Sequence, residues 1–345
     1  MKYIITFNSI QSNFSFLALI LIPLLYYFFG SSLSQIYFTK QNHYLSPRIF
    51  FDQAKYQNLS IMVFSLLLTP TNISRIQQQY RYFGKDFRLL APYSPFYVGF
   101  SAHIPGVDPV IRVNSLKDRS MINIHQLMYF YFEGLNYFLT KTRFRWFWRT
   151  TEDCFINYPK LLEFQNELES HYNTYEDTVI IGQVCEYSTI ESLAFIHGGA
   201  GWILSRKAAQ EFYNKRQFYY DYLSLPENNK TGDDVTTQFF MVQHNIKPSS
   251  MHNSKILSTK LDNKSVKALL ANDYRNISKC PPNPKEFPIT RRHIPMHELV
   301  AWHAGRNDVI SIVEGFRILA NVPKNIYVQY DHDYTTICIN TSVQI

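Results

Sequence analysis

The N-terminal stretch of the chain lacks charge. No Asp, Glu, Lys or Arg occurs between Lys2 and Lys40, and residues 14–30 read FSFLALILIPLLYYFFG. A membrane-spanning helix needs roughly 20 predominantly apolar residues, and the aromatic end of this run fits the belt that marks a membrane interface. We therefore predict an uncleaved, membrane-spanning signal anchor within residues 1–30, followed by a short stem over residues 31–57.

Two other interpretations of this run remain open. The first is a cleaved signal peptide, because Gly30, Ser31 and Ser32 are small residues of the kind found at cleavage sites. The second is an apolar helix buried in the protein core. The single charge of Lys2 is too weak a signal to orient a membrane span.

Glycine is also scarce, and several well-known motifs are absent. Only 12 of the 345 residues are glycine, and neither a P-loop nor the GxGxxG dinucleotide fingerprint occurs. The lack of a nucleophile elbow and of HExxH gives no support to a membrane-anchored hydrolase. The net charge of +7 comes without a dense Lys/Arg block, so we expect a nucleotide phosphate rather than a nucleic acid as the anionic partner.

Cysteine is limited to four residues, all beyond the apolar run: Cys154, Cys185, Cys280 and Cys338. An even number suits disulfide formation in an oxidising compartment, but four cysteines permit three connectivities and the sequence does not choose among them. Their spacing does not match a zinc ribbon. We interpret Cys154, which adjoins an acidic cluster, as a buried thiol.

Potential N-glycosylation sites are common after the apolar run. Six Asn-x-Ser/Thr sequons lie beyond it, at Asn58, Asn72, Asn229, Asn263, Asn276 and Asn340. A seventh, at Asn13, stands at the leading edge of the run and is attributed to chance. Each sequon alone is weak, but together with the anchor they favour a luminal C-terminal part.

The rest of the chain alternates between strand-like and helix-like patterns. Residues 60–68, 87–91, 110–113, 146–150, 178–184 and 298–303 are predicted strands, and residues 73–82, 122–139, 206–215, 233–244 and 309–319 are predicted helices. Residues 92–109 are predicted to be largely loop. Such alternation is typical of a doubly wound α/β nucleotide-binding fold, and we predict one such domain over residues 58–345.

An acidic cluster follows the most aromatic of these strands. Residues 146–153 read WFWRTTED, so the strand ends in Thr151, Glu152 and Asp153. Open α/β sheets bind their ligands at the carboxyl ends of their strands, and a carboxylate there can hold a divalent cation that neutralises a diphosphate. The alternative is an ordinary strand end with two solvated acids.

A glycine-rich loop lies further along the chain, at residues 198–201. Residues 195–205 read FIHGGAGWILS, which places Gly198, Gly199, Ala200 and Gly201 before a strand and the helix N-cap Ser205. Glycine permits a close backbone approach and positive φ, as a sugar-binding loop would require. A tight turn before a helix is the alternative.

Two further stretches carry candidate groups for chemistry. Asp233 and Asp234 open a predicted helix, where the helix dipole favours acids and where one of them could present a general base. His303 ends the apolar stretch ELVAWH. A histidine at a strand end is more often structural than functional.

These motifs, in this order and spacing, resemble the Fringe and core 1 β1,3-galactosyltransferase family, glycosyltransferase family 31. The matching segments are WFWRTTED, GGAGWILSR and GDDVT, with LLLTPT and VAWH at the two ends, so the resemblance covers roughly residues 58–320. It implies a GT-A fold and a single-pass type II membrane protein of the Golgi or endoplasmic reticulum. It also implies a UDP-sugar donor and Mn²⁺ as the divalent cation.

The resemblance assigns a role to each candidate residue. Asp153 and His303 correspond to metal ligands, and Asp234 corresponds to the catalytic base. Asp233 would be a cap or a supporting acid. The remaining positions would contact the nucleotide-sugar or line the donor and acceptor sugars: Thr69, Thr151 and Glu152 for the nucleotide-sugar, and Gly198, Gly199, Ala200 and Gly201 for the loop.

One departure from the family pattern leaves two functions open. Thr151 stands where the family has the first Asp of its Asp-x-Asp motif, so either metal affinity is weaker or Glu152 compensates. The expected function is inverting transfer of a hexose or N-acetylhexosamine, Gal or GlcNAc, from a UDP-sugar to a glycan or glycoprotein in a β1,3 linkage. The alternative is a catalytically inactive luminal glycan-binding or chaperone-like protein. The donor sugar, the acceptor and the oligomeric state do not follow from the sequence.

Overall fold

A computed structural model describes most of the chain from residue 58 onward. The described residues are 58–67, 72–80, 96–100, 103–108, 110–112, 124–186, 194–225, 233–245, 255–258, 261–275, 277–280, 293–303, 315, 318–319, 321–331 and 334–340. All of them belong to the unit Phe51–Ile345. The predicted anchor and stem, residues 1–57, lie outside this part. Within it, no helix combines the length and apolarity needed to cross a membrane.

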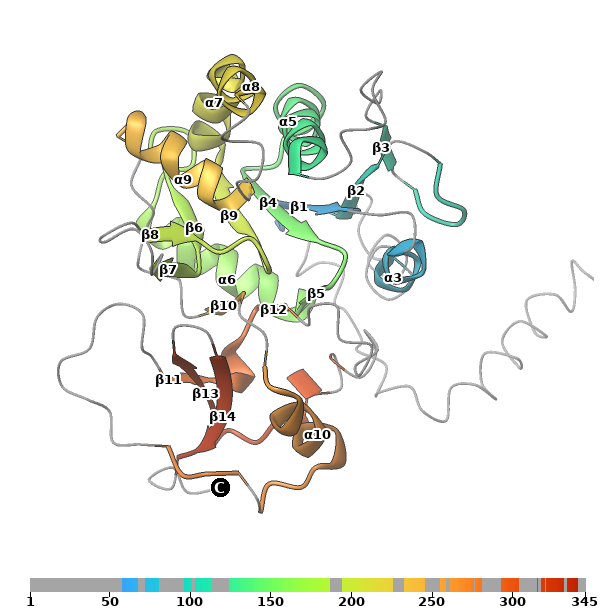
Figure 1. The fold of residues 1–345 in the computed structure, drawn as a ribbon, viewed down its shortest axis with the longest axis vertical. Coiled ribbons are helices and arrows are strands. Elements are labelled where there is room, and N and C mark those ends of the chain that lie inside the picture. The colour runs from blue at the N-terminus through green and yellow to red at the C-terminus, as the bar shows by residue number, and fades with distance from the viewer. Residues whose placement is uncertain are drawn as a thin grey trace, which may run out of the picture. The chain divides into compact units, whose positions relative to one another are not determined.

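The main structural element is a six-stranded sheet with the strand order β3-β2-β1-β4-β9-β6 (Figure 1). Its strands are β1 (Ile61–Leu66), β2 (Phe96–Phe100), β3 (Val110–Arg112), β4 (Trp146–Thr151), β9 (Trp202–Ser205) and β6 (Ile180–Gly182). The first four are parallel, and β9 runs antiparallel to both β4 and β6. Every residue of β1 and β4 is buried, which explains their near-continuous apolar sequences.

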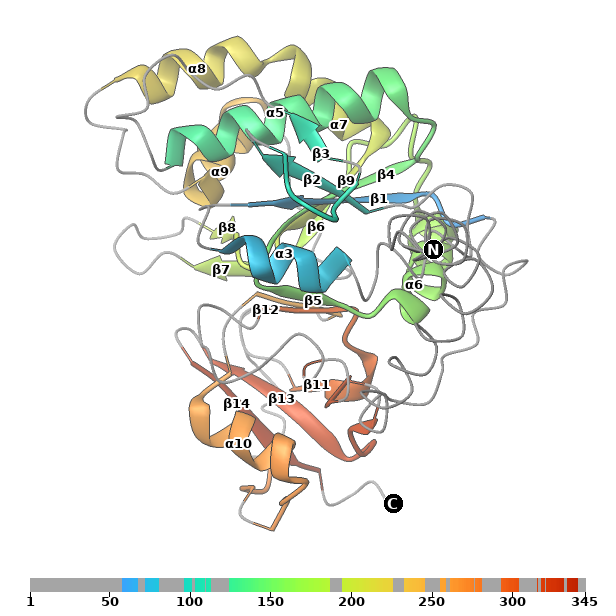
Figure 2. The ribbon, with the colours of Figure 1, turned by 90° about the vertical axis from the view of Figure 1, so that its right-hand side faces the viewer.

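Helices cover both faces of this sheet (Figure 2). One face carries α5 (Ile124–Lys141), α7 (Arg206–Asn214), α8 (Arg216–Ser224) and α9 (Asp233–Gln243), and the other carries α3 (Ile73–Gln79) and α6 (Tyr158–His171). Alternate residues of each strand point to opposite faces. Phe64 therefore packs in the cluster that includes Phe138 of α5, whereas Val63 packs in the cluster that includes Leu161 of α6.

Three smaller sheets complete the domain. One has the order β10-β12-β5, formed by Ile256–Leu257, Ala301–His303 and Cys154–Ile156, and a hairpin joins β7 (Val184–Glu186) to β8 (Ala194–Ile196). The third has the order β11-β13-β14, formed by His293–Pro295, Ile326–Asp331 and Tyr334–Ile339. The 3₁₀ helix η5 (Met296–Glu298) and the helix α10 (Asn263–Ala271) flank these strands.

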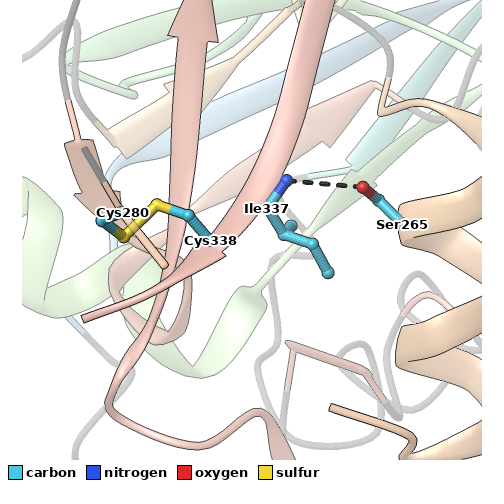
Figure 3. Close-up of a disulfide and its surroundings, with 4 residues drawn as sticks. All are labelled: Ser265, Cys280, Ile337 and Cys338. Carbon is cyan, nitrogen blue, oxygen red and sulfur yellow. Dashed lines mark hydrogen bonds between the residues drawn. A yellow bond between two sulfur atoms is a disulfide. The ribbon is translucent and has the colours of Figure 1, made fainter. Parts of the chain in front are cut away.

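A disulfide and a hydrogen bond stabilise the third sheet (Figure 3). Cys280 and Cys338 are joined with a Cα–Cα distance of 4.7 Å. The N–H of Ile337 donates to Ser265 Oγ at 3.4 Å, which ties β14 to α10. The disulfide settles one pairing that the sequence left open, and Cys154 is a buried free thiol, as predicted.

The mixed α/β architecture predicted from the sequence is confirmed, and most predicted elements are found. β1, α3, β3, α5, β4, α7 and α9 match their predicted ranges within a few residues. Ser205 caps α7, because its Oγ accepts the N–H of Ala208. Residues 92–109 were predicted to be largely loop, which residues 103–108 are, but the strand β2 within this stretch was missed. The predicted strand 178–184 divides into β6 and the start of β7, and the predicted strand 298–303 begins with the end of η5. Residues 87–91 and most of 309–319 lie outside the described part.

The order of the strands in the main sheet reverses between β1 and β4. The chain leaves β1 through α3 toward β2, and it returns from β3 through α5 to β4 on the opposite face. The strand order therefore reverses between β1 and β4, which is where open α/β sheets bind ligands. Leu66 pairs with Thr151 at the carboxyl ends of these two strands, so the acidic cluster that follows β4 lies at the point of reversal.

Candidate active site

A buried glutamine holds the acidic turn that follows β4. Gln79, which is 2% exposed at the end of α3, donates from Nε2 to the carbonyl oxygens of Glu152 at 2.9 Å and Cys154 at 2.7 Å. Its Oε1 accepts the hydroxyl of Ser65 on β1 at 3.3 Å. Because these bonds fix the backbone on both sides of Asp153, the direction of the Asp153 side chain is also restricted.

The carboxylate of Glu152 interacts with α3. Glu152 is 1% exposed, and its Oε1 accepts a short hydrogen bond from Nδ2 of Asn72. Asn72 also begins one of the six sequons. A glycan on its Nδ2 would stand next to this buried carboxylate, so we expect Asn72 to be a poorer glycosylation site than the exposed Asn58.

Asp153 and His303 meet through the pairing of two short strands. β12 runs antiparallel to β5 with His303 opposite Cys154, and His303 Nε2 lies 3.3 Å from Asp153 Oδ2. Burial pushes the pKa of Asp153 up. The hydrogen bond and the charge of His303, together with hydrogen bonds from Thr151 and the backbone, outweigh that effect and lower the pKa to about 2.

The orientation of the His303 ring is set by a backbone carbonyl. Nδ1 lies 2.8 Å from the carbonyl oxygen of Ser258, so Nδ1 carries a proton and Nε2 is the nitrogen that can accept. A histidine that ligates a metal is commonly held in this way, with its other nitrogen donating to a carbonyl. When the ring is neutral, Nε2 and Asp153 Oδ2 are two acceptors that face each other. A proton or a metal cation between them would interact favourably with both.

The Thr151 hydroxyl links Asp153 to the glycine-rich loop. Its Oγ1 lies 2.7 Å from Asp153 Oδ1 and 3.0 Å from the carbonyl oxygen of Gly199. Both neighbours are acceptors, so the single hydroxyl proton is shared between them. Thr151 therefore replaces a carboxylate of the family pattern with a group that orients Asp153 and adds no negative charge.

The glycine-rich loop approaches the site too closely for larger residues. A Cβ on Gly199 would lie 2.4 Å from His303 Nδ1 and 2.5 Å from the carbonyl oxygen of Ser258. Gly201 has φ +79, and a Cβ there would lie 1.7 Å from the carbonyl oxygen of Arg149. The glycines are needed for a positive φ and for direct contact of the loop backbone with β4 and β12.

Two side chains of β4 and that of Ser258, which follows β10, fix the loop in place. Arg149 donates from Nη1 to the carbonyl oxygen of Gly198 at 2.6 Å, and Trp148 Nε1 donates to that of Ala200 at 3.0 Å. The N–H of Ala200 donates to Ser258 Oγ at 3.1 Å. Each of these groups is buried, so the loop is a fixed wall of the site.

The loop connects the acidic turn to the start of α9. The N–H of Gly198 donates to Asp234 Oδ2 at 3.1 Å, and Asp234 is partly exposed. A chain of contacts therefore runs from Asp234 through Gly198 and Gly199 to Thr151 and Asp153. The backbone of Asp233 begins α9, whereas its side chain and all of Thr69 lie outside the described part.

The structure adds three residues that the sequence did not single out. Gln79 and Ser258 hold the acidic turn and the loop, and His197 Nδ1 accepts the N–H of Gly199 at 3.0 Å. The ring centroid of His197 lies 6.4 Å from that of His303. The position of His197, directly before the glycine-rich loop, is a signal that the sequence offers. No local pattern distinguishes Gln79 or Ser258.

The free thiol beside the site is not a nucleophile at neutral pH. Burial raises the pKa of Cys154 to about 12, with a further contribution from the charge of Asp153. A thiol must ionise to attack a substrate or bind a metal. The groups available for chemistry are thus a carboxylate paired with an imidazole, a partly exposed carboxylate, and a fixed backbone loop between them.

The middle and C-terminal parts of the chain match the model of a known protein family. The model of the Fringe-like family matches residues 108–334, about two thirds of the chain. The chain belongs to the Fringe-like family. Members of this family are glycosyltransferases. The matched range contains Asp153, the loop Gly198–Gly201, Asp234 and His303, whereas β1 and Thr69 precede it. No curated protein is similar enough to this Fringe-like chain to count as a match.

Proposed function

We propose that this protein is an inverting, Mn²⁺-dependent glycosyltransferase with a GT-A domain. It would move a hexose or N-acetylhexosamine, Gal or GlcNAc, from a UDP-sugar to a hydroxyl of a glycan or glycoprotein in a β1,3 linkage. The observation that carries the proposal is the meeting of Asp153 with His303 just after the carboxyl end of β4, in a member of the Fringe-like family.

The reversal of strand order between β1 and β4 supports nucleotide binding. The carboxyl ends of the strands at such a reversal are the usual place for a nucleotide in open α/β sheets. Thr151 and Glu152 stand at this edge, and Thr69 follows β1 by a few residues in the sequence. The net charge of +7 favours an anionic donor such as a nucleoside diphosphate sugar.

Asp153 and His303 suit a divalent cation that is shared with a diphosphate. Ligand atoms on adjacent corners of an octahedron about 2.1 Å from an ion lie about 3 Å apart, and Nε2 and Oδ2 are 3.3 Å apart. Where the structure describes the chain, no group of three or more His, Cys, Asp or Glu residues could hold a metal ion. Phosphate oxygens and water would therefore complete the coordination. When bound, the cation would neutralise charge on the departing UDP.

Asp234 is the proposed general base. Its carboxylate is partly exposed, and it accepts the N–H of Gly198, one residue before Gly199, which lies against His303. A base in this position can take the proton from an acceptor hydroxyl as the hydroxyl attacks the sugar from the side opposite the leaving UDP. Attack from that side inverts the anomeric carbon.

One feature favours a second function. Thr151 leaves the turn with one carboxylate fewer than the family pattern, and Glu152 is engaged by Asn72. A protein that binds a glycan without transferring sugar, as a luminal glycan-binding or chaperone-like protein, fits this loss. The two functions differ in whether UDP is released.

The cellular location is part of the proposal. We propose a single-pass type II protein of the Golgi or endoplasmic reticulum membrane, with residues 1–30 as the anchor and residues 31–345 in the lumen. The uncharged N-terminal run supports the anchor, and the Cys280–Cys338 disulfide supports an oxidising compartment.

Glycosylation of the expressed protein tests this location. Endoglycosidase digestion should lower its apparent mass. Asn58 is exposed and Asn72 is bonded to a buried carboxylate, so Asn58→Gln should remove one glycan while Asn72→Gln removes none. An unglycosylated protein that cytosolic protease digests would overturn the luminal assignment.

A screen of UDP-sugars tests the activity. The purified full-length protein is incubated with each UDP-sugar and a mixture of glycan acceptors, with Mn²⁺ or with a chelator, and released UDP is measured. We expect Mn²⁺-dependent release with at least one donor, and loss of UDP binding in Asp153→Asn. Asp221→Asn, on the exposed face of α8, serves as the control.

The outcomes of the screen separate the two functions. Glycan binding without UDP release from any donor would favour the non-catalytic function. UDP binding that neither Mn²⁺ nor Asp153→Asn affects would show that the Asp153–His303 pair is structural.

A further inference from the structure

The two oxygens of the Asp153 carboxylate have different partners. Oδ2 lies 3.3 Å from Nε2 of His303, and Oδ1 lies 2.7 Å from Oγ1 of Thr151. The Asp153 side chain is 9% exposed, so water has little access to these oxygens. The direction of the carboxylate is therefore set by the Thr151 hydroxyl on one side, and the carboxylate faces His303 on the other.

The surroundings of the Thr151 hydroxyl favour a hydrogen-bond donor. Thr151 is the last residue of β4 and is 6% exposed. Its Oγ1 also lies 3.0 Å from the carbonyl oxygen of Gly199. A carboxylate and a carbonyl are both acceptors, and a hydroxyl offers them a proton without adding charge. Thr151 thus fits the position that it occupies, and it is more than a missing carboxylate.

The neighbouring acid does not take over this role. Glu152 is 1% exposed, and its Oε1 accepts a hydrogen bond from Nδ2 of Asn72, the N-cap residue of α3. An ionised carboxylate has no proton to donate to Asp153. Glu152 is therefore engaged with α3, whereas the contact to the Asp153 carboxylate comes from Thr151.

We propose that Thr151 is a positioning residue, whose hydroxyl holds the Asp153 carboxylate in the direction in which it shares a divalent cation with His303. This inference rests on the proposed function. Groups that form hydrogen bonds to a metal ligand orient it, and their loss typically weakens metal binding about 10–100-fold. Thr151 acts through Asp153 rather than through contact with the nucleotide-sugar.

Substitutions at position 151 separate the hydroxyl from the shape of the side chain. Thr151→Ser keeps the hydroxyl and loses a methyl group, whereas Thr151→Val keeps the shape and loses the hydroxyl. Thr151→Ala is a second variant without a hydroxyl. Thr150→Val is the matched control, because Thr150 is the preceding residue of β4 and is 1% exposed. Its side chain points to the opposite face of the sheet.

The experiment compares the full-length wild-type protein with these four variants. Trace labelled UDP is mixed with each protein, and the Mn²⁺ concentration that gives half-maximal UDP binding is measured well below the melting temperature. For Thr151→Val and Thr151→Ala we expect this concentration to rise about 10-fold or more. For Thr151→Ser and Thr150→Val it should stay close to the wild-type value. The melting temperature without Mn²⁺ is measured in parallel, so that a loss of stability is recognised separately.

Three results would overturn the inference and leave the proposed function intact. A wild-type Mn²⁺ requirement in Thr151→Val would show that the hydroxyl is dispensable. An equal rise in Thr150→Val would show a general effect of packing in β4. An equal rise in Thr151→Ser would assign the effect to the methyl group. If the wild type binds no UDP, or binds it without Mn²⁺, the proposed function fails together with the inference.

Discussion

Two regions of this domain hold their shape by different means. The candidate site joins groups from α3, β4, the glycine-rich loop, α9, β12 and Ser258 through individual hydrogen bonds and ion pairs. The sheet β11-β13-β14 instead has a disulfide at its edge and a core that includes Ile326, Val328 and Ile337. Polar contacts define the first region, and covalent and apolar contacts define the second.

This difference predicts how each region responds to substitution. A directional hydrogen bond orients a group and adds only about 1 kcal/mol to stability, so its loss should affect chemistry more than folding. A disulfide restricts the unfolded chain and leaves distant groups unchanged. We therefore expect substitutions in the site to change activity first and substitutions in the C-terminal sheet to change stability first.

The largest expected effect tests the site. In Asp234→Asn the proposed base is lost, and sugar transfer should fall by about 10²–10⁴-fold. UDP and Mn²⁺ binding and the melting temperature should remain close to wild type, because the amide can still accept the Gly198 N–H. Transfer assays and UDP titrations on the same preparation check both parts.

The neighbouring acid provides the matched control. Successive residues of a helix point about 100° apart, so Asp233 and Asp234 do not both reach one hydroxyl. Asp233→Asn should reduce transfer much less, or should cost about 1 kcal/mol of stability, the usual worth of a helix cap. Wild-type transfer by Asp234→Asn would exclude this residue as the base.

The second prediction concerns the disulfide of the C-terminal sheet. Cys280 and Cys338 are 58 residues apart, and opening a loop of that length should lower the free energy of unfolding by about 4 kcal/mol. Denaturant unfolding of the Cys280→Ser, Cys338→Ser double variant measures this loss. The native fraction should bind UDP as tightly as the wild type.

A reducing agent offers the control for that experiment. Reduction should destabilise the wild type and leave the double variant unchanged. If the double variant keeps its stability but loses UDP binding, the contrast between the two regions is wrong.

The third prediction concerns a position where fold and site coincide. Gly201 has φ +79, and an added Cβ would lie 1.7 Å from the carbonyl oxygen of Arg149. Gly201→Ala should therefore cost about 3 kcal/mol or more and weaken UDP-sugar binding as well. Gly106→Ala is the control, because Gly106 has φ +75 with nothing within 4 Å of an added Cβ. It should cost only about 1 kcal/mol of stability. Equal losses of stability at the two glycines would show that the positive φ alone, and not the contact with Arg149, causes the loss.

The smallest expected effect is a pH dependence of stability. The pKa of Asp153 falls from 3.8 to about 2 on folding, so its ionised form stabilises the fold. This contribution is complete above about pH 4 and is lost as the pH falls toward 2, and it amounts to about 2 kcal/mol. The difference in unfolding free energy between wild type and Asp153→Asn should shrink by that amount between pH 5 and pH 2. A difference that stays constant over this range would show that the pairing with His303 does not stabilise the ionised form of Asp153.

The sequence predicted the elements whose patterns are local. β1 and β4 were predicted from continuous apolar runs, and α7 was predicted from its Ser205 cap. β2 was missed, since its sequence FYVGF lies in a proline-rich stretch and contains a glycine where Phe64 packs closely. Its place in the sheet depends on pairing with β1, which is a tertiary contact.

The same distinction holds for the site. Asp153, Asp234, His303 and the loop were identified because each lies at the end of an element or in a recognisable motif. Gln79 and Ser258 were not, because a buried polar side chain is defined by its partners rather than by its neighbours in the sequence. The roles assigned to these residues, the anchor and the position of Thr69 remain predictions.

The pairing of β12 with β5 has a consequence for how the protein folds. Cys154 and His303 face each other although more than a third of the chain separates them in sequence. Contacts between distant segments form slowly, because the intervening chain must first lose entropy. The parallel strands β1–β4 are complete early in synthesis, whereas His303 leaves the ribosome near its end. We therefore expect the Asp153–His303 pair to form after the main sheet, so that a nascent chain is folded in part before its proposed cation site is complete.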